Sequence, residues 1–248
     1  MHPYLFNIAI YSIWLIPTAI VAWWQERKLT RGSGKTIKPL SYLYSSYTLA
    51  LFAGIMLVTG TIPPIDLHIE WQRLAVQTYA FVIFTAVCAG IFFSAICLSI
   101  VARNTRTTNY TSWFIRGALT IFLMAPTITA IFSIKDTTTI IYAFRSAQVA
   151  FLLMILTTTM PTFLRAIYSY LTKGEQLKHQ HELKIILTCF ALQLCFELTM
   201  PLVAHGLHIY ALHVPKEVAL FGSILAAICD VTVLRSFCTI ACEEQKNG

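Results

Sequence analysis

The sequence has little charge and no long hydrophilic segment. Only 12% of its 248 residues are Asp, Glu, Lys or Arg, against about 25% in soluble domains. Hydrophobic residues make up 57% of the chain. So few polar side chains cannot cover a water-facing surface, which excludes an ordinary soluble domain. The composition predicts an all-α polytopic membrane protein, with residues 1–248 forming a single transmembrane domain.

The sequence also lacks any Cys-x-x-Cys pair, and this argues against a metal-binding knot or a redox motif. We expect no metal. Nearly all of the cysteines fall in apolar runs, where they are expected to pack between helices as small apolar side chains. The seven cysteines are Cys88, Cys97, Cys189, Cys195, Cys229, Cys238 and Cys242.

The net charge of +7 does not indicate nucleic-acid binding. The basic residues gather in short segments between apolar runs, so they report on membrane topology instead. No nucleic-acid partner is expected, and the lipid bilayer is the first partner that the sequence predicts.

Seven apolar runs are each long enough to cross a hydrocarbon core of about 30 Å. The first has no basic region before it and no small-residue cleavage site after it, so we expect it to be retained as a helix. No internal repeat of the kind found in many transporters is visible. The predicted spans are 3–24, 41–62, 74–102, 112–134, 138–164, 184–210 and 217–240.

Lys and Arg concentrate in alternate loops, and the positive-inside rule places those loops in the cytosol. The N-terminus is then luminal or outside and the C-terminus cytosolic; the endoplasmic reticulum or another endomembrane is the expected location. The rich loops hold Arg27, Lys28, Arg31, Lys35 and Lys38, then Arg103, Arg106 and Arg116, then Arg165, Lys173, Lys178 and Lys184; the others hold Arg73, Lys135 and Lys216.

Tryptophans and prolines add structural expectations. The tryptophans at span ends predict an interfacial aromatic belt: Trp23, Trp24, Trp71 and Trp113. The prolines inside spans each remove a backbone hydrogen bond and tend to kink their helix: Pro17, Pro126, Pro161 and Pro201.

Ionisable residues inside the membrane are costly and mark candidate sites. Glu197 lies in the sixth span on a polar stripe with Gln193 and His205. Asp230 lies in the seventh span, and both acids are about 20 Å from the luminal end of their helices. The pair can therefore face one cavity, although an interhelical hydrogen bond that locks the bundle is the structural alternative.

Two arginines differ in their expected roles. Arg145 lies one to two turns inside the fifth span, with Gln148 three residues later on the same face. It can contact a substrate or pair with Glu197 or Asp230 as structural glue. Arg235 is five residues from Asp230, which is 140° around a helix, so the two are not placed to pair and Arg235 is expected to extend to the interface.

Seven spans with an outside N-terminus is also the architecture of G-protein-coupled receptors. Their motifs are missing: "SIVARNTR" ends the third span without Asp/Glu-Arg-Tyr, "CFELTMP" replaces Cys-Trp-x-Pro, and Asn-Pro-x-x-Tyr is absent. The seventh span has no lysine past Lys216, so it cannot carry retinal as microbial rhodopsins do. A receptor for a small ligand remains the second interpretation, and a proton-coupled transporter the third.

The chain resembles the small seven-helix integral membrane terpene cyclases of fungal secondary metabolism. The resemblance covers its length, its span number, its short loops and an acid in the middle of the last helix, Asp230 in "AAICDVTV". It implies acid-initiated cyclisation or epoxide opening of an apolar terpenoid or polyene. The family's Trp-Glu pair within an early helix is missing, because Glu70 and Trp71 in "IEWQR" fall in a predicted loop.

The chemistry suits the residues present. A carboxyl group in an apolar cavity can stay protonated near neutral pH and donate a proton, and aromatic faces can stabilise a developing cation. An apolar small-molecule substrate can enter from the lipid, and no cofactor is required. A membrane enzyme is therefore the first interpretation, with Asp230 and Glu197 as catalytic residues; the predicted substrate-binding residues are Arg145, Gln148, Gln193 and His205.

Overall fold

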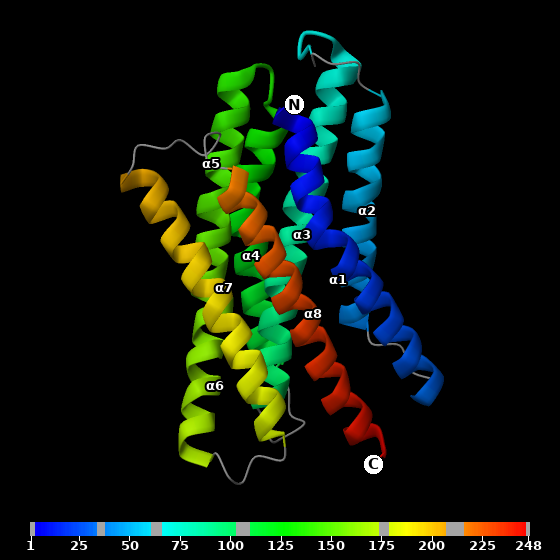
Figure 1. Ribbon diagram of the computed structural model, residues 1–248. Helices are drawn as coiled ribbons and strands as arrows, with labels where there is room; N and C mark the ends of the chain where they lie inside the picture. Colours follow the sequence, from blue (N-terminus) through cyan, green and yellow to red (C-terminus); the bar gives the residue numbers. More distant parts are fainter. Residues whose placement is uncertain are drawn as a thin grey trace.

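The computed structural model describes residues 3–33, 38–60, 66–102, 110–173, 179–206 and 216–246, and these residues are helical apart from short turns. Figure 1 shows the helices as a bundle of long rods. In chain order they are α1 (Pro3–Ser33), α2 (Lys38–Gly60), α3 (Glu70–Ala102), α4 (Tyr110–Phe132), α5 (Thr137–Met154), η1 (Ile155–Thr159), α6 (Met160–Lys173), α7 (Gln180–Gly206) and α8 (Lys216–Lys246).

The segments α5, η1 and α6 follow one another without a break and form one long rod. Residues Ile155–Thr159 are π-helical, and the backbone N–H of Met160 donates to the carbonyl oxygen of Ile155, five residues back. Pro161 comes next and has no N–H to donate. A wider turn directly before a proline leaves room for its ring, so the irregularity predicted at Pro161 takes the form of a π-bulge.

The helix α3 begins four residues before the predicted span. Asp66 closes the preceding turn: its side chain accepts from the backbone N–H of His68 at 2.9 Å, and its own N–H donates to Gln72 at 2.7 Å. Glu70 and Trp71 therefore lie in the first helical turn rather than in a loop, and both are exposed. The difference arises because the local hydrogen bonds of Asp66 and Gln72 define this end, and hydropathy does not register them.

The helices pack around two apolar cores that share α3. The first core joins α1, α2, α3, α6, α7 and α8, and its largest fully buried side chain is Tyr47. The second lies between α3, α4 and α5; its buried members are Phe84, Cys88, Ala130, Ile131, Ile134, Ala143, Ala150 and Met154. In the first core, α1 packs against both α2 and α8, and α7 packs against α8.

Four helical stretches among the described residues are long and apolar enough to cross a membrane: Glu70–Ile96, Ile115–Phe132, Thr138–Thr172 and Glu217–Ile240. Large apolar side chains also cover the outside of the bundle. Phe122 is 74% exposed and Leu171 is 75% exposed. Such side chains on the outer faces of long helices are suited to contact with lipid tails rather than with water.

Candidate functional site

The carboxyl group of Asp230 is held between three helices. Its Oδ2 accepts a hydrogen bond from the indole Nε1–H of Trp14 on α1, at 2.7 Å. Its Oδ1 accepts from the amide Nε2–H of Gln193 on α7, at 2.8 Å. These distances are within the normal range of N–H···O hydrogen bonds. Asp230 therefore joins α1, α7 and α8 through its two oxygens.

Asp230 lies on the inward face of α8, because Ala227, Val233 and Leu234 around it are buried. Arg235 is exposed on another side of the helix. The partners of Asp230 are the indole and the amide. The 140° between Asp230 and Arg235 predicted only that these two would not pair. As whole residues, Asp230, Trp14 and Gln193 are each partly buried.

An aromatic pair lines the α1–α2 side of the cluster. The rings of Trp14 and Tyr47 are edge-on, with centroids 5.2 Å apart. Tyr47 is fully buried. The tip of this phenol lies over Gly90 of α3, where an added Cβ would be only 2.5 Å from the hydroxyl oxygen. Glycine at position 90 is what allows Tyr47 to reach this position.

Two cysteines lie beside the cluster on its α7–α8 side. The side chains of Cys189 on α7 and Cys229 on α8 interact with each other. Both are free thiols, and Cys229 is buried. This contact also connects α7 and α8. Cys229 lies one residue before Asp230 on α8, and Cys189 lies four residues, or about one turn, before Gln193 on α7.

The sequence pattern did not single out Trp14. The predicted aromatic belt includes only tryptophans at span ends, and Trp14 lies in the middle of a span. A signal for it existed. An indole N–H is a donor only, and when it is placed deep in an apolar helix it requires an acceptor. The carboxylate of Asp230 is that acceptor.

The other predicted site residues fall elsewhere or outside what is described. Arg145 and Gln148 lie on the exposed surface of α5, and α5 packs against α4, η1 and α3. The structure does not bring them to the carboxyl group of Asp230. Glu197 and His205 are on α7, but their side chains lie outside the described residues. Their roles, and a shared cavity for Glu197 and Asp230, stay predictions.

A second polar cluster surrounds η1. Arg116 of α4 donates to Thr162 at 3.1 Å, and Thr158 and Thr162 each donate to the carbonyl oxygen four residues earlier. The buried hydroxyl of Thr159 has no hydrogen-bond partner. The hydroxyl groups of Thr158 and Thr162 thus pair with the backbone of the rod itself, as threonine side chains do where a membrane helix is irregular.

No protein-family model, curated protein or solved structure matches this chain. The fold and the site therefore define a class only. Within its described residues the protein is an all-helical bundle with four helices suited to cross a membrane, and it carries a hydrogen-bonded carboxyl group between α1, α7 and α8.

Proposed function

We propose that the chain is a seven-span integral membrane enzyme that opens or cyclises an apolar terpenoid or polyene epoxide beside Asp230. The observation that supports this most is the pair of hydrogen bonds that hold the Asp230 carboxyl group next to the Trp14 and Tyr47 rings. An acid and aromatic faces side by side are what a cation-forming cyclisation requires.

The seven-span topology rests on helix length. Beyond the four stretches named above, α1, α2 and α7 have 31, 23 and 27 residues. At 1.5 Å per residue even the shortest is about 34 Å long, more than the hydrocarbon core. The loop charges place the N-terminus in the lumen or outside and the C-terminus in the cytosol, with an endomembrane as the proposed location.

The proposed reaction begins with the protonated carboxyl group. Each carboxyl oxygen has two lone-pair positions, so Asp230 can keep its bonds to Trp14 and Gln193 and still carry a proton on a remaining position. That proton passes to the epoxide oxygen, one of the two carbon–oxygen bonds breaks, and the oxygen stays on the other carbon as a hydroxyl group. The carbocation then adds to a double bond within the same substrate. Loss of a proton from carbon to a base ends the reaction, and the net change is an isomerisation.

The rings next to Asp230 fit the cationic stage. The faces of tryptophan and tyrosine attract a positive charge, by an amount that grows when water is excluded. Trp14 also donates to Oδ2, so one side chain positions the acid and offers an aromatic face. Glu197 is proposed as the second acid or the base, as its place on the polar stripe of α7 suggests.

A purely structural lock is the competing role for Asp230. It is favoured by the same two bonds, because both carboxyl oxygens already have protein donors on other helices. The two roles predict different mutational patterns. If Asp230 is structural, a substitution there should lower turnover only as far as it lowers the amount of folded protein. If Asp230 is the catalytic acid, a substitution that removes its proton should abolish turnover in protein that is still folded.

The test is expression of the full chain in a microbial host fed with epoxidised polyprenyl substrates. Asp230→Asn is expected to abolish cyclised product, because an amide cannot donate an acidic proton. Trp14→Phe removes one hydrogen bond but keeps the acid and an aromatic ring, so it is expected to retain part of the turnover. Glu197→Gln tests the second acid in the same assay.

The matched control is Thr127→Val, which removes an interhelical hydrogen bond of 3.0 Å to Ser146 in the other core. It should leave turnover unchanged. Product that survives in both Asp230→Asn and Glu197→Gln would disprove the proposed site. Equal loss of product and of folded protein in Asp230→Asn, Trp14→Phe and Gln193→Leu would instead favour the structural lock.

A further inference from the structure

The last turns of α1 carry two cations that each lie against a tryptophan ring. The guanidinium carbon of Arg27 is 4.1 Å from the ring centre of Trp23, and the ammonium group of Lys28 is 5.9 Å from that of Trp24. Each pair is four residues apart, so the two pairs lie next to each other on the helix. Contact with the rings limits the positions that these long side chains adopt.

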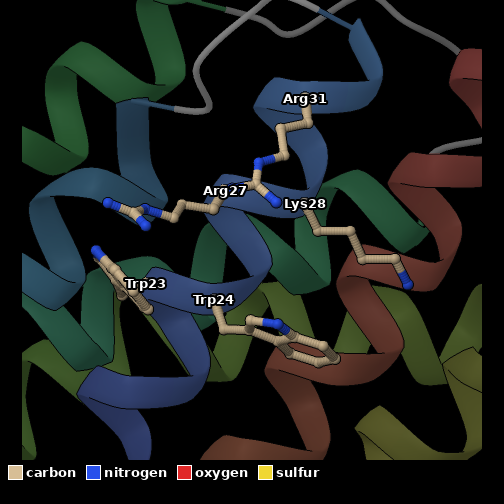
Figure 2. A pocket seen from close by; sticks show the side chains of 5 residues that line it. All are labelled: Trp23, Trp24, Arg27, Lys28 and Arg31. Carbon is tan, nitrogen blue, oxygen red and sulfur yellow. The ribbon is translucent and has the colours of Figure 1, made fainter.

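Arg31 completes the group. It is four residues after Arg27 and three after Lys28, so it lies on the same side of α1. Figure 2 shows its guanidinium reaching back between the stems of Arg27 and Lys28. With Trp23 and Trp24, these three residues line a surface hollow of about 270 Å³. We refer to these five residues as the α1 basic hollow.

The exposed charges described on this face of α1 are positive. Glu26 is only 8% exposed and faces the interior together with Gln25 and Leu29. Arg27, Lys28 and Arg31 are exposed on the outside. Three cations around one hollow provide several N–H donors for one anion, and arginine fits phosphate oxygens in a bidentate manner.

The position along α1 points to the kind of anion. Ile16 and Ile20, further toward the helix middle, are 46% and 59% exposed, which suits lipid tails. One to two turns later the exposed face changes to tryptophan and then to basic residues. Tryptophan rings favour the headgroup level of a bilayer, so the hollow lies where lipid phosphates lie.

We propose that the α1 basic hollow binds the phosphate group of an anionic phospholipid headgroup. Arg27 and Arg31 contact the phosphate oxygens, Lys28 adds a third positive charge, and the two tryptophans pack against the glycerol region. With the proposed topology this is the cytosolic leaflet, where anionic lipids attract basic segments near membrane helices. The inference does not depend on the chemistry proposed for Asp230.

The experiment uses the full chain purified in detergent with graded amounts of phosphatidylserine, phosphatidylinositol or phosphatidylcholine, and native mass spectrometry counts the bound lipids. The test variant is Arg27→Gln/Lys28→Gln/Arg31→Gln. The matched control is Arg165→Gln/Lys184→Gln/Arg235→Gln, which removes the same charge from three exposed positions on other helices. Inorganic phosphate in place of lipid forms a separate arm.

We expect the wild type and the control to bind one anionic lipid more tightly than phosphatidylcholine. In the test variant the apparent dissociation constant should rise about tenfold or more, given what each basic residue contributes near an anionic surface. Trp24→Leu should weaken the same binding less. An unchanged melting temperature in phosphatidylcholine shows that each variant is folded.

Three results would overturn the proposal. One is equal lipid binding by the test variant and the wild type. Another is equal weakening in the test variant and the scattered control, because that indicates net charge alone. The third is a response to inorganic phosphate with no preference for anionic over zwitterionic lipid, because the hollow would then bind a free anion.

Discussion

The two cores of this bundle hold their helices together in different ways. The core between α3, α4 and α5 is apolar, and one polar contact between its helices is the 3.0 Å bond of Thr127 and Ser146. Gln77 of α3 also donates to the carbonyl oxygens of Phe132 and Ile134 at the end of α4. The other core has a carboxyl group at its edge, with donors from two further helices at 2.7 and 2.8 Å. The first contact joins two neighbouring helices, and the second joins α1, α7 and α8.

The two contacts differ in the free energy that it costs to bury their groups and in the free energy lost when one partner is removed. A hydroxyl pair costs little to bury and contributes little, about 0.6 kcal/mol on average between membrane helices. A carboxylate removed from water is costly unless donors compensate it, and donors left behind without their acceptor are costly as well. A buried carboxyl group therefore indicates a role in assembly or in chemistry. The hydroxyl pair of Thr127 and Ser146 does not indicate such a role.

The largest expected effect comes from removing the acid. Asp230→Ala leaves the indole N–H of Trp14 and the amide of Gln193 without their acceptor, so the free energy of unfolding should fall by about 2–4 kcal/mol. Titrated unfolding in mixed micelles measures this change. A loss no greater than that of Thr127→Val would remove the contrast between the two cores.

Gly90→Ala should have the next largest effect. The new methyl group would meet the Tyr47 hydroxyl, and the buried ring cannot move without disturbing Trp14. Overpacking costs about 1–3 kcal/mol, and the gain in helix propensity of about 1 kcal/mol offsets part of it. We expect a net loss of up to about 2 kcal/mol in the same unfolding assay.

Gly117→Ala is the matched control for that substitution, because an added Cβ there meets nothing within 4 Å. It should be neutral or slightly stabilising. Equal effects at positions 90 and 117 would show that Tyr47 is not tightly held.

In the α3–α4–α5 core, Thr127→Val should cost about 0.6 kcal/mol. The side chain is buried and similar in shape, so the main change is the loss of the hydrogen bond to Ser146. The double variant with Ser146→Ala completes a cycle in which the second change adds almost nothing. Additive losses in this cycle would mean that each hydroxyl has another role.

The smallest effect is expected at the α4–α5 turn. Asp136 caps α5, and hydrogen bonds from the backbone and side chain of Thr139 hold the pKa of its carboxyl group below the usual value. A lowered folded pKa means that the stabilisation is present above about pH 4 and is lost as pH falls through the folded pKa. Asp136→Ala should therefore lower the melting temperature slightly at pH 7 and flatten its acid dependence. The same shift at all pH values would contradict this.

Helix positions could be predicted because membrane helices need long apolar runs. Each predicted span overlaps a helical rod, although the span 112–134 runs two residues past the end of α4 at Phe132. The ends were less predictable. The helix α3 begins before its predicted span because Asp66 and Gln72 form a side-chain hydrogen bond there. The helix α1 continues to Ser33, past its predicted span, through basic residues that a hydropathy criterion leaves out. The π-bulge before Pro161 likewise depends on backbone geometry.

The sequence predicted only part of the candidate site. Depth along a helix can be counted, so Asp230 and Gln193 were identified as inward-facing polar residues. The rotation of a helix about its axis, relative to its neighbours, cannot be read from the sequence. Arg145 was therefore a candidate partner of Glu197 or Asp230, although it lies on the exposed face of α5. Trp14 has no charge and no motif, so only its neighbours reveal its role.

The sequence by itself determined the class of this protein, because its composition cannot support a water-facing surface and its apolar runs have the length of membrane helices. It also determined that an acid lies within the last helix. Only the tertiary structure decided which side chains meet that acid. Trp14 and Asp230 are 216 residues apart in the chain, and their contact depends on how α1 and α8 pack, which no local pattern encodes.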